Sequence, residues 1–184
     1  MTLAVVVRQM TNLSVSHPEN TPALTRLWNR GHGADRLGLE IARAQLEIGY
    51  RFSILLVQLD GLDRVTDRLG HASTDSVWRR VLGVLTHDLG AEDLCCRLGG
   101  EEFMLIFPHR TGLECRVLVD RLRQRWTSAR SPLETTMRLS VGVASYPDQG
   151  STIEAMFGAG DEAMFADKNR DEAARSMESL SRLQ

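Results

Sequence analysis

The apolar positions of this chain follow a helical period in some segments and a strand period in others, so the pattern predicts an ordered series of elements. Apolar residues recur every three to four positions in the segments that we expect to form helices, namely 34–48, 75–89, 118–126 and 151–168. The polar segment 61–69, which stops before Gly70, predicts one more short helix.

Strands are predicted where apolar residues run together or alternate with polar ones. The segment 52–59 is apolar at nearly every position, as expected for a central strand covered on both faces. Two runs, 93–98 and 102–107, flank a glycine pair and predict a β-hairpin. Apolar and polar or small residues alternate over 137–144 and predict a further strand. The predicted fold class is α/β, or α+β: a sheet of at least four strands with an antiparallel hairpin and helices packed on it.

Composition narrows the class of protein. A chain of 184 residues, 42% hydrophobic and 25% charged, is long enough for one core, and its net charge of −2 argues against a basic nucleic-acid binder. No apolar run reaches the roughly 20 residues of a membrane span, so we expect no membrane contact by this chain. The three cysteines match no disulfide framework, which favours the cytoplasm. Residues 1–23 lack periodicity and are expected to be a linker or the end of an upstream region.

Two glycines followed by two glutamates form the most informative motif. Gly99 and Gly100 can adopt positive φ without a Cβ clash, so they permit a tight turn and close approach of a ligand to the main chain. Glu101 and Glu102 present carboxylates there, and proteins commonly hold Mg²⁺ by one or two carboxylates together with substrate phosphates. These residues alone are equally consistent with an ordinary solvated hairpin tip.

Ordered motifs along the chain resemble those of the GGDEF family of diguanylate cyclases. Residues 24–30 read LTRLWNR and resemble LTxLxNR, 60–75 resemble the segment after the first strand, and 99–103 read GGEEF. Residues 140–144 read SVGVA, and 161–168 follow the terminal ADxALYxAK helix. The resemblance implies a GGDEF domain over 24–170 and a C-terminal helix or tail over 171–184.

What the resemblance implies is a palm-like fold of the nucleotidyl-cyclase type with a ferredoxin-like central sheet. Two subunits of a homodimer would each bring one GTP and join them into cyclic di-GMP with Mg²⁺ or Mn²⁺. Glu101 would be a metal ligand and a candidate base, and Glu102 would support the same metal cluster. Gly99 and Gly100 would provide close approach to the substrate.

The resemblance also implies the remaining substrate contacts. Asp75 would accept the N1 and N2 protons of guanine, and Lys168 would contact phosphate. Asp75 has a competing structural role as the N-cap of its helix, and Ser73 or Thr74 could cap that helix instead. Packing is the expected role of the tryptophans, Trp28, Trp78 and Trp126.

Several positions depart from the family pattern. The aspartate that holds both metals at the end of the first strand is replaced by Gln58, so Gln58 and the adjoining Leu59 stand at the metal position without a negative charge. The positions of the lysine, asparagine and arginine that handle phosphate and base are occupied by Asp63, Thr66 and Glu172. Exposure of the two acidic replacements would make them harmless, because solvated surface charges have small effects.

Two hypotheses follow. In the first, the chain is a cyclase module, fused to an upstream sensor or receiver, that makes cyclic di-GMP poorly. In the second, it binds GTP, cyclic di-GMP or another protein and transmits a signal without catalysis. The family's inhibitory RxxD site corresponds to 90–93, which keeps Asp93 and lacks the arginine, so ordinary feedback inhibition is not expected.

Overall fold

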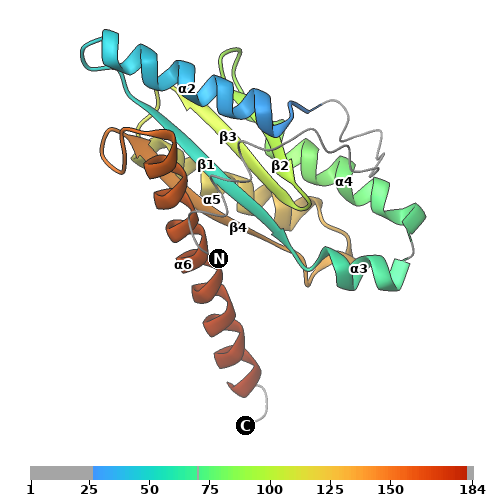
Figure 1. Ribbon diagram of the computed structural model, residues 1–184. Coiled ribbons are helices and arrows are strands. Elements are labelled where there is room, and N and C mark those ends of the chain that lie inside the picture. The colour runs from blue at the N-terminus through green and yellow to red at the C-terminus, as the bar shows by residue number, and fades with distance from the viewer. Residues whose placement is uncertain (1–26, 70, 182–184) are drawn as a thin grey trace.

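The computed structural model describes residues 27–69 and 71–181, without the side chains of 68–73, 171, 172 and 174–181 (Figure 1). The predicted linker over 1–23 lies outside the described residues. The elements follow the predicted order, with one unpredicted 3-10 turn: α2 (Arg30–Leu46), β1 (Phe52–Asp60), α3 (Leu62–Leu69), α4 (His71–Thr86), β2 (Leu94–Gly99), β3 (Glu102–Pro108), α5 (Gly112–Ala129), η2 (Pro132–Glu134), β4 (Arg138–Tyr146) and α6 (Ile153–Ser181).

The strands form one antiparallel sheet in the order β2-β3-β1-β4. Strand β1 is central, with β3 on one side and β4 on the other. This order, with helices between β1 and β2 and between β3 and β4, is the ferredoxin-like arrangement, and it confirms the predicted fold class. None of the described helices combines the length and the apolar character that crossing a bilayer requires.

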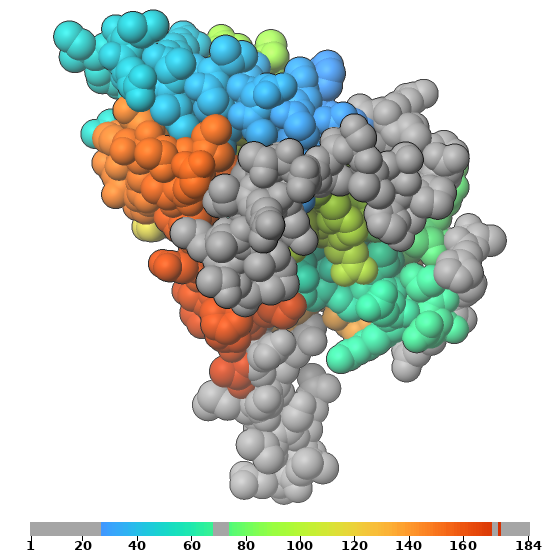
Figure 2. All heavy atoms as spheres, viewed as in Figure 1, coloured from blue at the N-terminus to red at the C-terminus, as the bar shows by residue number. Residues whose placement is uncertain are grey.

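Alternation along β1 divides the core into two layers. Leu55, Val57 and Leu59 face α4 and α5, whereas Ile54 and Leu56 face α2 and α6. Figures 1 and 2 show α2 and the first turns of α6 on the same face of the molecule. Both faces of β1 are therefore covered, as its nearly continuous apolar run predicts.

The adjacent cysteines of β2 follow the same alternation. Cys95 belongs to the α4–α5 layer and Cys96 to the α2–α6 layer, so both thiols are buried. Burial raises the pKa of each of these thiols to about 12. Neither is therefore a reactive thiolate at neutral pH.

Helices α2, α4 and α5 begin earlier than their apolar periods indicate. Helix α2 starts at Arg30, because the Asn29 side chain caps it by accepting a hydrogen bond from the His32 amide at 3.0 Å. Helix α4 starts at His71, four residues before Asp75. Capping of α4 by Asp75, or by Ser73 or Thr74, is therefore wrong, since all three lie inside the helix.

The glycine of the SVGVA segment lets α6 approach β4 closely. A Cβ atom added at Gly142 would lie 1.9 Å from the Gly160 carbonyl oxygen and 2.6 Å from the Met164 amide nitrogen. Asp167 fastens the same helix, because its buried carboxylate accepts from the Val141 amide at 2.9 Å and pairs with Arg123 at 2.5 Å. The close main-chain approach at Gly142 and the bonds of Asp167 thus set the position of α6, the helix that carries Lys168.

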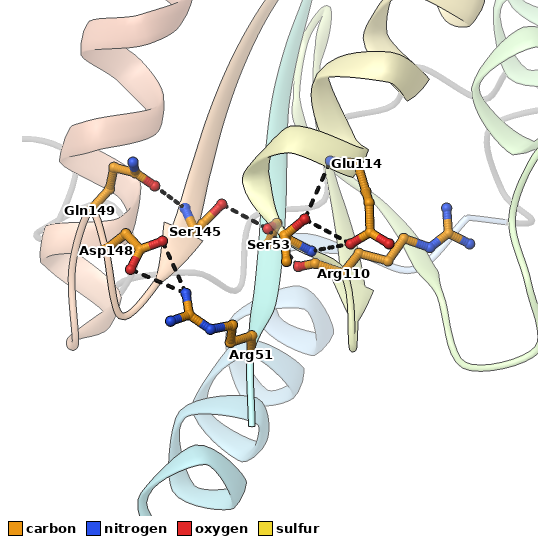
Figure 3. A network of polar contacts seen from close by, with 8 residues as sticks. Arg51, Ser53, Arg110, Glu114, Ser145, Asp148 and Gln149 are labelled. Carbon is orange, nitrogen blue, oxygen red and sulfur yellow. Dashed lines mark hydrogen bonds and ion pairs between the residues drawn. The ribbon is translucent and has the colours of Figure 1, made fainter. Parts of the chain in front are cut away.

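The start of β1 is held by a polar network that connects two loops (Figure 3). The Ser53 hydroxyl donates to the Arg110 carbonyl at 2.8 Å and lies 2.8 Å from the Ser145 hydroxyl. The Ser145 amide donates to Gln149 at 2.8 Å, and Arg51 pairs with Asp148 at 3.1 Å. These contacts join the loops after β3 and β4 at the end of β1 opposite Gln58.

Candidate functional site

The end of β1 and the tip of the β2–β3 hairpin bring the predicted metal residues together. Gln58 lies opposite Glu102 on β3 and opposite Ser140 on β4. The Leu59 amide donates to the Glu101 carbonyl at 3.0 Å, so Glu101 follows directly where the strand pairing ends. Directly opposed residues of an antiparallel pair point to the same face, which places the Gln58 and Glu102 side chains together on the α6 side of the sheet.

The glycine pair forms a turn that other residue types would adopt only with strain. Gly99 has φ 150° and Gly100 has φ 51°, and the strand pairing shifts register between Arg97 and Gly99. A Cβ at either glycine would meet nothing within 4 Å, so the glycines serve the backbone conformation and leave the surface above the turn open.

Asp60, two residues after Gln58, already has partners within the fold. Lys168 of α6 pairs with its carboxylate at 2.5 Å, and the Ser140 hydroxyl donates to the same carboxylate. The charge of Asp60 is therefore paired with Lys168, and Gln58 contributes no negative charge of its own. Lys168 lies at the predicted site, but a phosphate would have to compete with Asp60 for it.

The face around Glu102 carries a second acid from α6. Removal of water by the surrounding protein raises the pKa of the Glu102 carboxyl, although its side chain still reaches solvent, and the negative charge of Asp161 raises it further. The positive charge of Arg30, at the start of α2, acts in the opposite direction. Desolvation also raises the pKa of the half-buried Asp161. The site thus holds carboxylates that are costly to ionise without a cation.

Replacing Asp161 by Asn is expected to stabilise the fold at neutral pH. The Asp161 carboxyl has a raised pKa in the folded chain, so it binds its proton more tightly there than in the unfolded chain. The free energy of unfolding therefore decreases as the pH rises from 3.8 through the folded-state pKa. We expect D161N to raise Tm by about 1–3 °C at pH 7, since about 1 kcal/mol shifts Tm by roughly 2–4 °C in a chain of this size. The gain should vanish below the ordinary pKa of 3.8.

Thermal unfolding by circular dichroism at several pH values measures this effect. Asp120→Asn, at an exposed position of α5, is the matched control and should leave Tm unchanged. An equal shift for D161N at pH 3 and pH 7 would contradict the electrostatic explanation.

The predicted base-recognition residues lie on the two helices after β1. Thr66 is half-buried on α3, and Asp75 is half-buried in the second turn of α4. Asp63 is exposed on the first turn of α3, so solvent screens its charge and its effect on a bound triphosphate is reduced. The side chain of Glu172 lies outside the described residues.

The predicted metal residues offer few anionic donors. No cluster of three or more His, Cys, Asp or Glu side chains suited to a metal occurs in the described part of the chain. Glu101 offers a carboxylate, Gln58 an amide oxygen and Leu59 a main-chain carbonyl, which is on the same side of β1 as the Leu59 amide. This donor chemistry fits one Mg²⁺ or Mn²⁺ shared with nucleotide phosphates.

Three features of this region were not anticipated from the sequence. Arg97 donates from Nε and from its terminal amino group to the Gly100 carbonyl, at 2.9 and 2.6 Å. Arg30 and Asp161 stand in recognised motifs, but their electrostatic effect on Glu102 required the fold. Packing is confirmed for Trp78 and Trp126, which are buried, whereas Trp28 is 54% exposed and stacked on His32 at 3.9 Å.

Residues 90–93, where the resemblance places an inhibitory site, are held by contacts within the chain. The Asp93 carboxylate accepts from Arg110 at 2.8 Å and from the Gly90 amide at 2.8 Å. Asp93 therefore closes its own turn and anchors the loop after β3.

Comparisons with known proteins agree on one family. The family model described as "Diguanylate cyclase, GGDEF domain" matches residues 20–174. The chain is 28% identical over 176 residues to "Diguanylate cyclase TpbB" of Pseudomonas aeruginosa, covering 92% of this chain and 40% of TpbB. It is 31% identical over 153 residues to "Response regulator PleD" of Caulobacter vibrioides, covering 80% of this chain and 34% of PleD. The chain thus spans less than half the length of these curated relatives.

Solved structures agree with the fold. The GGDEF domain of P. aeruginosa TpbB superposes with a TM-score of 0.70 at 27% identity, covering 80% of this chain and 93% of that one. The diguanylate cyclase SiaD of P. aeruginosa, solved in complex with its activator SiaC, gives a TM-score of 0.70 at 27% identity, covering 91% and 62%. The GGDEF domain of Caulobacter crescentus DgcB, solved with cyclic di-GMP, shares the fold at 24% identity and a TM-score of 0.71, covering 87% and 93%. These neighbours confirm the palm-like fold class.

Proposed function

The chain belongs to the GGDEF domain family, and we propose that it is a signalling module of cyclic di-GMP metabolism whose diguanylate cyclase activity is weak or lost. The single observation that carries the second part is the neutral Gln58 at the end of β1, beside Glu102 and next to an Asp60 that is already paired. Two divalent ions would bring four positive charges to a site that lacks one of its two main anions.

The size of the deficit follows from Coulomb's law. A pair of unit charges about 4 Å apart contributes about 1 kcal/mol in water and about 4 kcal/mol at an effective dielectric constant of 20. Loss of one anion beside a divalent ion therefore removes several kcal/mol of attraction. The amide oxygen of Gln58 can coordinate a metal, but its dipole does not replace a full charge.

The remaining residues support nucleotide binding. Glu101, with the Leu59 carbonyl and the Gln58 amide oxygen, would hold one Mg²⁺ or Mn²⁺, which would polarise a phosphate. Lys168 would leave its ion pair with Asp60 and bind a phosphate of the nucleotide. Asp75 on α4 would accept the guanine N1 and N2 protons, a donor pair that adenine does not present.

Turnover and binding measured on the same dimeric preparation test the proposal. We expect calorimetry with GTP and Mn²⁺ to show binding. We expect cyclic di-GMP to form more than about tenfold slower than with the GGDEF domain of TpbB assayed alongside, since about 1.4 kcal/mol corresponds to tenfold. Formation of cyclic di-GMP at the TpbB rate would refute weak activity.

Asp75→Ala is expected to reduce the preference for GTP over ATP by about tenfold or more, because hydrogen bonds to a charged group contribute about 1.5–3 kcal/mol. Calorimetry with both nucleotides measures the ratio. Asp35→Ala, at an exposed position of α2, is the control and should keep the wild-type ratio. An unchanged ratio in D75A would remove Asp75 from base recognition.

The alternative function is a non-catalytic module that binds GTP, cyclic di-GMP or a protein partner. The pairing of Lys168 with Asp60 favours it, because the cation that we propose for phosphate binding is engaged within the chain. Nucleotide binding without any turnover, including with Mn²⁺, would select this alternative. Under either function we propose an upstream sensor or receiver region, since the relatives are much longer, and a homodimer for any catalysis.

A further inference from the structure

The tip of the acidic hairpin is held by a side chain of its own first strand. Arg97 is half-buried, and two of its N–H groups converge on the Gly100 carbonyl at 2.9 and 2.6 Å. Its main-chain amide donates to the Trp28 carbonyl at 2.9 Å. These bonds tie the residue before the register shift to the second glycine of the turn, so they restrain the turn that presents Glu101.

The same guanidinium contacts helix α4. The Arg97 guanidinium carbon lies 5.4 Å from the centre of the Trp78 ring, and Trp78 is only 3% exposed. Trp78 also meets the Phe103 ring edge-to-face, with ring centres 6.0 Å apart. One indole therefore contacts the hairpin on both sides of the glutamate pair.

Helix α4 connects this contact to the proposed base site. Asp75 precedes Trp78 by three residues, so the two side chains lie on the same side of α4. A displacement of the hairpin tip would thus be transmitted to Asp75 through a buried ring, and Glu101 and Asp75 would be set relative to one another.

We propose that Arg97 and Trp78 form a positioning pair that fixes the Gly99–Gly100 turn against α4 and thereby sets Glu101 relative to Asp75. The functional part of this inference rests on the proposed nucleotide binding. The pair acts through Glu101 and Asp75. Arg97→Lys keeps the charge and loses the planar fork, while Trp78→Leu removes the aromatic face and Trp78→Phe keeps one.

The Leu59 amide reports on the position of the tip without any ligand, because it donates to the Glu101 carbonyl. Hydrogen exchange followed by NMR should show exchange of this amide about tenfold faster in R97K and W78L, in line with weakened local protection. The Val141 amide, which donates to Asp167, should be unaffected, and W78F should lie nearer wild type than W78L. Arg116→Lys, at an exposed position of α5, is the matched control and should change neither amide.

Binding separates positioning from general stability. The ratio of the GTP affinity in Mn²⁺ to the GTP affinity in EDTA gives the metal-dependent increment in affinity. We expect R97K to reduce this ratio about fivefold to tenfold. Binding in EDTA should change less in R97K than in W78L, because Trp78 lies on the helix of Asp75. R116K should retain the wild-type increment.

Each outcome decides the inference. Equal acceleration at the Leu59 and Val141 amides would show a global stability effect and overturn it, as would unchanged exchange at Leu59. Faster exchange at Leu59 with an unchanged increment would overturn the link to Glu101. Absence of GTP binding in the wild type would refute the proposed function alone, and the exchange data would still decide whether the pair fixes the turn.

Discussion

Gln58→Asp is expected to increase the rate of cyclic di-GMP formation by about tenfold or more, since an anion about 4 Å from a cation contributes about 1–4 kcal/mol per unit charge pair. The substitution places a carboxylate on the α6 side of the sheet, beside Glu102 and near the tip that carries Glu101. We expect the hairpin turn and α4 to keep their conformations in this variant. A gain would show that the missing anion limits turnover.

The thermal stability of Gln58→Asp should also depend on whether a metal ion is bound. A new carboxylate beside Glu102, whose pKa is already raised by desolvation and by Asp161, adds repulsion in the absence of a cation. We therefore expect the Tm of Q58D to fall below that of the parent in EDTA and to recover with Mn²⁺ and GTP. Differential scanning fluorimetry with and without the metal measures both directions.

Gln58→Asn is the matched control, because it keeps a neutral amide at the same position. It should show neither the gain in turnover nor the metal-dependent Tm. Intact GTP binding together with unchanged turnover in Q58D would contradict the explanation and direct attention to the acidic replacements at Asp63 and Glu172.

Gly142→Ala is expected to cause the largest loss of stability among Gly→Ala changes in the described part of the chain. The new Cβ would meet the Gly160 carbonyl and the Met164 amide, which are main-chain atoms, so relief requires movement of α6 away from β4. We expect a loss of about 3 kcal/mol or more, at the upper end of overpacking effects, and a Tm lower by about 6–12 °C. Displacement of α6 should also separate Lys168 from Asp60.

Gly83→Ala is the control: it makes the same change of residue type at a position where the added methyl group causes no steric clash. Gly83 is exposed on α4, and an added Cβ would meet nothing within 4 Å. Ala is favoured over Gly in a helix by about 0.8–1.0 kcal/mol, so G83A should unfold at or above the parent Tm. Circular dichroism melts of both variants measure the contrast. A parental Tm for G142A would show that α6 accommodates the methyl group without loss.

Local pattern predicts the elements of this protein well because each depends on neighbouring residues. The apolar run of β1 predicts a central strand covered on both sides, and the glycine pair predicts the turn of the hairpin, with positive φ at both positions. The first residue of a helix is harder to predict. The first turn of α4 begins at His71 and contains no residue of the apolar stripe. The stripe of a helix marks its buried face and says little about its first turn.

The motifs and the neutral residue at Gln58 could be read from the sequence alone, because the residue type at a motif position is independent of the fold. The state of the site could not. Lys168 and Asp60 are 108 residues apart, and their pairing depends on the seating of α6 on β4. The raised pKa of Glu102 depends in part on Asp161 of α6, and Arg97 of β2 contacts Trp78 of α4. Both effects likewise require elements that are separate in the sequence to lie close in space. Sequence determined which chemical groups are present, whereas tertiary structure decided which are already paired, because charge pairing depends on distances in space.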